Sequence, residues 1–171
     1  STRHIGFDMP EGAGTYAAGD HLAVHPVNPE ALVDGICGHL GLPRGAWFRI
    51  LGASVAALDR YREGYPVERL LAEDLDLGMP EAPEELFVAM RGASRDADDQ
   101  LQLDRWIATL SLDEADPARR ALRDWLRETY HTTLDLFDAF PKSVPPIDVL
   151  IELLPKQKPR MYSVASSPLV H

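Results

Sequence analysis

The chain returns to a β-strand at RMYSVAS, residues 160–166, close to the end of its 171 residues. A second strand is predicted at residues 21–25, where Leu22 and Val24 are out of phase with two histidines. Residues 5–9 alternate in the same way and predict a further strand, with Ile5, Phe7 and Met9 on one face. Strands are therefore expected at both ends of the chain, with a long segment between them.

The segment between the strands carries helical periodicity almost throughout. Asn28 and Pro29 predict the start of the first helix, with Asn as the N-cap and Pro at the first helical position. Gly41 predicts the end of that helix. The expected buried stripe, spaced by four residues, is Leu32, Ile36 and Leu40.

Further helical stripes follow from about residue 66, opened or closed by prolines and separated by a predicted polar loop at residues 94–100. This order of strands, helices and a returning strand predicts an α+β fold in which a helical insertion interrupts a sheet domain. A doubly wound parallel sheet would instead alternate strands with helices. The stripes are Val67, Leu70, Leu71 and Leu75; Leu86, Phe87 and Met90; Leu103, Trp106, Ile107 and Leu110; Leu122, Trp125 and Leu126; Leu134, Phe137 and Phe140; Leu150, Leu153 and Leu154.

The composition excludes several classes of protein. Lys and Arg number 17 against 27 Asp and Glu, and the net charge of −10 argues against broad nucleic-acid binding. No stretch reaches the roughly 18 apolar residues of a membrane span. No secretory signal is visible, so we expect a cytoplasmic protein. The single Cys37 excludes an intramolecular disulfide framework, and a start at Ser1 rather than Met leads us to expect a fragment.

Three side chains of the returning strand suit a dinucleotide. Arg160 can pair with a pyrophosphate through its planar guanidinium. Tyr162 lies two residues on, on the same strand face, and can stack on a ring. Ser163 can donate to or accept from a ring nitrogen. The alternative for this short motif is an exposed arginine beside a tyrosine at the edge of the core.

Three blocks of sequence occur in an order and spacing typical of one family. They are STRHI at 1–5 with YAAGDHLAVHP at 16–26, PPID at 145–148 with ELLP at 152–155, and RMYSVASS at 160–167. In these blocks the chain resembles the FAD-binding region of the diflavin reductases. That family includes NADPH–haemoprotein reductase, the sulfite reductase flavoprotein, nitric oxide synthase reductase domains and bacterial monooxygenase–reductase fusions. Residues 44–130 match it only in their helical pattern.

The resemblance implies an antiparallel FAD-binding β-barrel of the ferredoxin reductase type, interrupted by an all-helical connecting domain. Residues 1–27 would form the first part of the barrel, 28–157 the connecting domain, and 158–171 the strand with the Arg-x-Tyr-Ser motif. The resemblance also implies FAD as the cofactor, an NADPH-binding domain, and a flavodoxin-like FMN domain that serves a haem protein or other acceptor. Those domains and the remaining barrel strands lie outside residues 1–171, so we expect this fragment to be inactive alone.

The resemblance further implies roles for individual residues. Arg160 would hold the FAD pyrophosphate, and Tyr162 would pack against the isoalloxazine and the ribityl chain. Ser163 would be the catalytic residue near flavin N5, where the hydride from NADPH arrives. Met161 replaces a residue that is often aromatic and would contact FAD mainly through its backbone. Arg3 matches a position that resembles an NADP phosphate contact.

Two further positions bear on the cofactor. His21, in the segment GDH, matches a position near the same cofactor region. The family often has an arginine serving FAD at the position of Tyr130. Arg127 lies about one helical turn from it, so either Arg127 substitutes for that arginine or the contact is lost.

Several other side chains have structural explanations. Cys37, Trp106 and Trp125 lie on or beside helical stripes, so we expect them in the core. His21 and His25 are four residues apart on a strand, roughly 13 Å, which is too far for one metal ion. No metal site is therefore predicted.

Two further short motifs do not predict a ligand site. Asp96, Asp98 and Asp99 could suggest a hard cation, but the surrounding EF-hand pattern is missing, and a solvated loop is favoured. Gly12 and Gly14 form a lone G-x-G in a turn that does not open a helix, so a Rossmann site is not predicted. No G-x-S-x-G motif supports a hydrolase.

Two functions of different classes remain open. The first is a fragment of an NADPH-dependent flavoprotein oxidoreductase that passes electrons from NADPH through FAD to FMN and then to a haem or other acceptor. The second is a non-catalytic helical protein-interaction module derived from such a reductase. The intact Arg160, Tyr162 and Ser163 favour the first function, whereas Tyr130 in place of an arginine favours the second.

Residues 1–171 by themselves are expected to be poorly soluble or oligomeric. A barrel cut after Ser166 leaves unpaired strand edges, and such edges pair with other chains. Analytical sedimentation of the purified chain measures its state of association. A stable, monodisperse monomer would contradict the truncated barrel.

Overall fold

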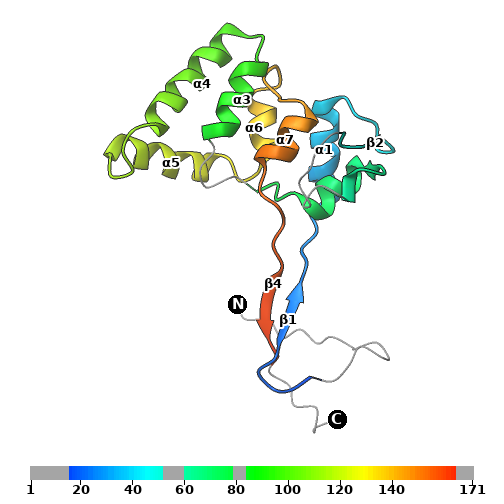
Figure 1. Ribbon diagram of the computed structural model, residues 1–171. Helices are drawn as coiled ribbons and strands as arrows, with labels where there is room; N and C mark the ends of the chain where they lie inside the picture. Colours follow the sequence, from blue (N-terminus) through cyan, green and yellow to red (C-terminus); the bar gives the residue numbers. More distant parts are fainter. Residues whose placement is uncertain (1–15, 52–59, 79–83, 165–171) are drawn as a thin grey trace. The chain divides into compact units, whose positions relative to one another are not determined.

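The computed structural model describes residues 16–51, 60–78 and 84–164 (Figure 1). The predicted strand at residues 5–9, the G-x-G turn and Arg3 lie outside these ranges. The chain divides into two compact units, one of residues 1–25 with 159–171 and one of residues 26–158. The described residues form helices and two small antiparallel sheets of two strands each, which confirms the α+β class.

The first unit contains a two-stranded antiparallel ribbon (Figure 1). Strand β1, His21–Val24, pairs with β4, Arg160–Ser163, so both predicted strands are confirmed over these residues. A tight turn leads into β1, in which the amide of Asp20 donates to the carbonyl of Ala17 at 3.0 Å. Gly19, the third residue of the turn, has φ +94°, a conformation that favours glycine.

The second unit consists mainly of helices around one apolar core (Figure 1). Strand β2, Trp47–Phe48, pairs antiparallel with β3, Tyr65–Pro66. No helix among the described residues is both long and apolar enough to span a bilayer. The helices are α1 Glu30–Leu40, α2 Val67–Arg69 continuing as the π-helical turn η2 Leu70–Asp74, α3 Glu84–Ala93, α4 Ala97–Leu110, α5 Pro117–Thr129, α6 Thr133–Ala139 and α7 Ile147–Leu153.

Most of the predicted stripes form this core. Every member of the stripes on α2–η2 and α3 is buried, because each faces the other helices of the unit. On α1 the most buried residues are Val33, Ile36 and Cys37, whereas Leu32 and Leu40 are only partly buried. The predicted stripe was therefore displaced by about one position, and the expected burial of Cys37 is confirmed.

The predicted N-cap of α1 is wrong. Pro29 occupies the cap position, and no side chain bonds to the first turn of the helix. The Asn28 amide instead donates to the carbonyl of Leu71 at 2.6 Å and to that of Leu75 at 2.7 Å. Leu71 lies in η2 and Leu75 directly follows it, so Asn28 serves a tertiary contact rather than its own helix. The predicted end of α1 at Gly41 is confirmed, with φ +64°.

The loop predicted at residues 94–100 is wrong in its second half. Helix α4 begins at Ala97, and the Asp96 carboxylate caps it by accepting from the amides of Asp98 and Asp99. The Lys142 ammonium lies 2.8 Å from the same carboxylate and, with these amides, lowers the pKa of Asp96. The acidic cluster is therefore a helix start, which explains its composition without a cation.

The two tryptophans expected in the core differ in burial. Trp106 is buried and contacts several aromatic rings, among them Phe87 and Phe140 at centroid distances of 5.1 and 5.3 Å. Trp125 packs on Trp106 at 5.7 Å but is 45% exposed. Its placement in the core was thus only half correct, because α5 buries a single residue, Leu126, completely.

The chain enters and leaves the second unit at one place. Gln157 Nε2 donates to Asn28 Oδ1 at 3.1 Å, and the Gln157 amide donates to the carbonyl of Asp74 at 2.8 Å. The Asp76 amide bonds to the carbonyl of Pro155 at 2.7 Å. We call the contacts of Asn28 with Gln157, Leu71 and Leu75 the entry clasp.

Helix α1 approaches α6 closely at Gly35. A Cβ at Gly35 would lie 2.5 Å from a methyl carbon of Leu134, whereas a Cβ at Gly38, one turn later, would meet nothing within 4 Å. We expect Gly38→Ala to stabilise the fold, because alanine favours a helix over glycine by about 1 kcal/mol. Gly35→Ala should be less stable than Gly38→Ala by at least about 1 kcal/mol, because Leu134 must move.

Urea unfolding of both glycine variants measures the difference. Equal stability of Gly35→Ala and Gly38→Ala would mean that α1 and α6 do not pack as closely as described.

The entry clasp is tested at Asn28. Asn28→Asp keeps the oxygen that accepts from Gln157 but replaces the donor to two carbonyls with a carboxylate. We expect a loss of about 2–4 kcal/mol of unfolding free energy, whereas Gln157→Ala, which removes one hydrogen bond from the clasp, should cost about 1 kcal/mol. Chemical unfolding of the two variants provides the comparison. A smaller effect at Asn28 than at Gln157 would contradict the clasp.

Candidate functional site

Strand β4 carries four of the predicted site residues, and its register with β1 sorts them onto two faces. Residues directly opposite in an antiparallel pair share a face, and successive residues alternate between faces. The opposite pairs are His21 with Ser163, Leu22 with Tyr162, Ala23 with Met161, and Val24 with Arg160.

One face of the ribbon carries Arg160 and Tyr162. The residues opposite them, Val24 and Leu22, are partly buried and add apolar side chains to the same face. Tyr162 is 56% exposed, so most of its ring is open to a ligand. A guanidinium two residues from an open aromatic ring can hold an anion and a flat ring system together.

The other face carries Ser163, Met161 and His21. All three are exposed, and Met161 exposes 58% of its surface. The Ser163 hydroxyl can donate or accept one hydrogen bond from a ligand, and the His21 ring can do either, depending on its protonation. His21 thus lies directly across from the predicted catalytic serine, a relation that residue spacing alone did not reveal.

The chemistry of these donors fits a flavin dinucleotide. Arg160 supplies a cation for a pyrophosphate, Tyr162 an open ring face, and Ser163 a neutral hydroxyl. The nearest described carboxylate on the ribbon, Asp20, accepts from the amide of Ala17 at 2.7 Å in the turn before β1. That carboxylate supports the turn that begins the strand.

Tyr130 lies in the helical unit at the C-cap of α5. Its ring packs edge-on against Trp125 and Trp106, at centroid distances of 5.9 and 6.1 Å, and burial raises its pKa. The tyrosine therefore has an aromatic packing role that an arginine at this position would not fill. Arg127 lies one turn earlier on the same helix.

Sequence spacing did not indicate a cluster of polar side chains around Asp74. The Asp74 side chain is 7% exposed, pairs with Arg60, and accepts from the hydroxyl of Tyr61 at 3.1 Å. Burial, aided by this carboxylate, raises the pKa of Tyr61 to about 12. Arg60 also donates to the Tyr65 hydroxyl at 3.1 Å. These groups satisfy one another and hold η2 against β3 and the residues just before it, so we assign the cluster to stability.

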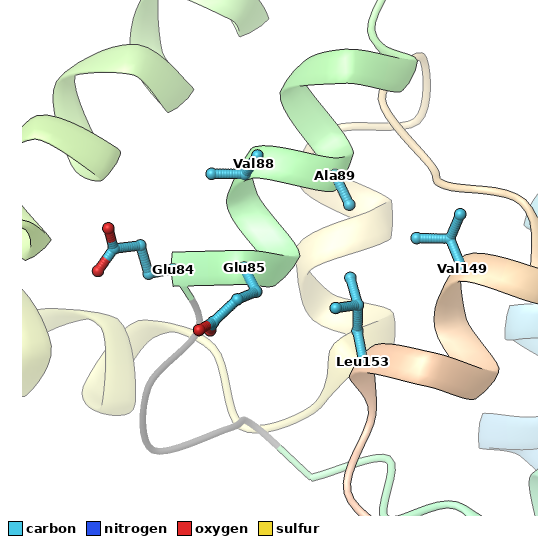
Figure 2. A pocket seen from close by; sticks show the side chains of 6 residues that line it. All are labelled: Glu84, Glu85, Val88, Ala89, Val149 and Leu153. Carbon is cyan, nitrogen blue, oxygen red and sulfur yellow. The ribbon is translucent and has the colours of Figure 1, made fainter. Parts of the chain in front are cut away.

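A shallow groove of about 390 Å³ lies between α3 and α7 (Figure 2). Its walls are apolar, and two carboxylates stand at the start of α3. The Ser111 hydroxyl already bonds to Glu84 at 2.7 Å. The groove brings together no acid–base pair or nucleophile, so the ribbon remains the candidate site. Its lining residues are Glu84, Glu85, Val88, Ala89, Val149 and Leu153.

Comparison with known proteins places these observations in context. The family described as FAD binding domain matches residues 1–171, the whole chain. A bifunctional cytochrome P450/NADPH–P450 reductase of Bacillus cereus is 33% identical over 179 residues, covering 99% of this chain and 15% of the relative. The bifunctional reductase 2 of Bacillus subtilis is 28% identical over 171 residues, covering 100% and 15%.

Reductases that are not named as fusions with a P450 match the chain as well. The NADPH–cytochrome P450 reductase of Oryctolagus cuniculus is 28% identical over 170 residues, which cover 98% of this chain and 24% of the relative. The chain therefore spans between 15% and 24% of the length of these relatives.

Proposed function

The chain belongs to the FAD binding domain family, and from that premise we propose that it is the part of an NADPH-dependent diflavin reductase that holds FAD. Its relatives are NADPH–P450 reductases, which supports a flavoprotein oxidoreductase. In this proposal residues 1–27 and 158–171 contribute strands to an FAD-binding barrel, and residues 28–157 form the helical connecting domain. Electrons would pass from NADPH through FAD to FMN in a partner domain, and then to a haem protein or another acceptor.

The observation that carries the proposal is the shared face of Arg160 and Tyr162 on a paired strand. Arg160 holds the pyrophosphate of FAD, and Tyr162 packs against the isoalloxazine and ribityl chain. The partly buried Leu22 and Val24 lie beside them on the same face and add apolar surface next to the ring. Met161, on the other face, contributes mainly its backbone.

Ser163 is the proposed catalytic residue. Bound FAD supplies the redox chemistry, accepting a hydride from NADPH at N5 and releasing single electrons. The Ser163 hydroxyl is neutral. It can donate a hydrogen bond to that nitrogen when the nitrogen carries no proton, and accept one when it does. His21, opposite Ser163, and Arg3 are proposed to contribute to the cofactor region, Arg3 through an NADP phosphate.

The alternative function is a non-catalytic helical interaction module. Tyr130 occupies a position at which the diflavin reductases often have an arginine, and Trp125 in α5, just before it, is half-exposed. Both features support a role in contacting another protein. The two functions differ in whether the ribbon binds FAD.

Titration of the purified chain with FAD tests the proposal through flavin fluorescence and the visible absorption spectrum. We expect saturable quenching in the wild type and weaker binding in Arg160→Ala. Loss of a charge-assisted contact of about 1.5–3 kcal/mol corresponds to roughly a tenfold to hundredfold rise in Kd. Arg105→Ala, which removes an exposed arginine of α4, is the matched control and should bind as the wild type does.

The outcomes separate the two functions. An equal Kd for Arg160→Ala and the wild type would refute the assignment of Arg160. If the chain does not bind FAD, the titration is repeated on a chain extended through the remaining barrel. Recovery there supports the reductase, and continued failure supports the interaction module.

A further inference from the structure

His21 and Ser163 form a cross-strand pair with the closer of the two antiparallel spacings. The amide of Val164 donates to the carbonyl of Asp20 at 2.7 Å. Hydrogen-bonded and non-hydrogen-bonded pairs alternate along an antiparallel ladder. The next pair, His21 with Ser163, is therefore non-hydrogen-bonded, and its Cβ atoms are about 4.5–5.5 Å apart.

Both side chains are available to each other at this separation. Neither has a hydrogen-bond partner within residues 16–51, 60–78 and 84–164, and both are exposed. An imidazole nitrogen lies two or three bonds beyond Cβ and a serine oxygen one bond beyond it, so a direct hydrogen bond fits this spacing.

We propose that His21 is a positioning residue that sets the direction of the Ser163 hydroxyl. When protonated, the His21 ring donates to Ser163 Oγ, and the hydroxyl hydrogen turns outward as a donor. When neutral, the ring accepts that hydrogen, and Oγ presents its lone pairs as an acceptor. The protonation state of His21 thereby decides whether Ser163 presents a donor or an acceptor to a ligand.

Among the residues that the structure describes, the ribbon places few other charges near the pair. On the same face of the ribbon lie Ala23 and Met161, which are neutral, and His25 follows four residues after His21. Asp20 precedes His21 in the chain, but its carboxylate is engaged by the Ala17 amide. Arg160 is on the opposite face. His21 is thus the titratable group across from Ser163 in the described ribbon.

The consequence for catalysis rests on the proposed function, but the pair itself does not. A direct test measures the pKa of His21 and His25 in the same chain without FAD. The method is hydrogen–deuterium exchange at the imidazole C2 position, followed by mass spectrometry of peptides. The variants are Ser163→Ala, which removes the hydroxyl, and Ser163→Thr, which keeps it.

In Ser163→Ala the pKa of His21 is expected to move by about 0.3–1 unit, the equivalent of one hydrogen bond, while that of His25 stays unchanged. In Ser163→Thr the pKa of His21 should remain at the wild-type value. An unchanged His21 pKa in Ser163→Ala, or equal shifts at His21 and His25, would overturn the proposal.

A second readout is the pH profile of FAD binding. The Kd of the wild type is expected to change with pH, and His21→Gln should give a flat profile. His25→Gln, the matched control at the residue directly after β1, should keep the wild-type profile. A pH dependence that persists in His21→Gln counts against the proposal. If the wild type does not bind FAD, the profile is measured on the chain extended through the remaining barrel. Failure there refutes the proposed function, whereas the pKa comparison still decides the pair.

Discussion

The fold depends on the closure of the helical unit where the chain enters and leaves it. Asn28 lies at the entry and bonds to the carbonyls of Leu71 and Leu75 and to Gln157 at the exit, 129 residues later. The amides of Asp76 and Gln157 add two backbone hydrogen bonds at the same place, to the carbonyls of Pro155 and Asp74. Because a loop closure costs entropy that grows with loop length only slowly, a few hydrogen bonds and a packed core suffice to hold such a distant pair.

The ribbon and the helical unit have different sources of stability. The helices bury a continuous apolar core that includes Leu70, Phe87, Leu103 and Phe137. A two-stranded ribbon is marginally stable by itself in water, and its β4 residues are all exposed. The candidate site thus lies on an element with little packing of its own, where a bound ring would bury the exposed Tyr162.

Local signals predicted most of the helices correctly and failed where a side chain served a distant partner. Pro117 and Gly41 behave as their local propensities require. Asn28 has an equally strong capping propensity, yet its amide bonds to η2. At Asp96 the error is the opposite one. A run of acidic residues predicted a solvated loop, whereas Asp96 caps α4 and pairs with Lys142.

By itself, the sequence determined the order of strands and helices, the apolar stripes and the Arg-x-Tyr-Ser motif, because these depend on near neighbours and on the 3.6- and 2-residue periods. Only the tertiary structure decided that His21 lies opposite Ser163 and that Leu134 packs closely on Gly35. It also decided that Asn28 joins the two ends of the helical unit. These relations link residues far apart in the chain. Their partners are chosen by register and packing, which local spacing does not encode.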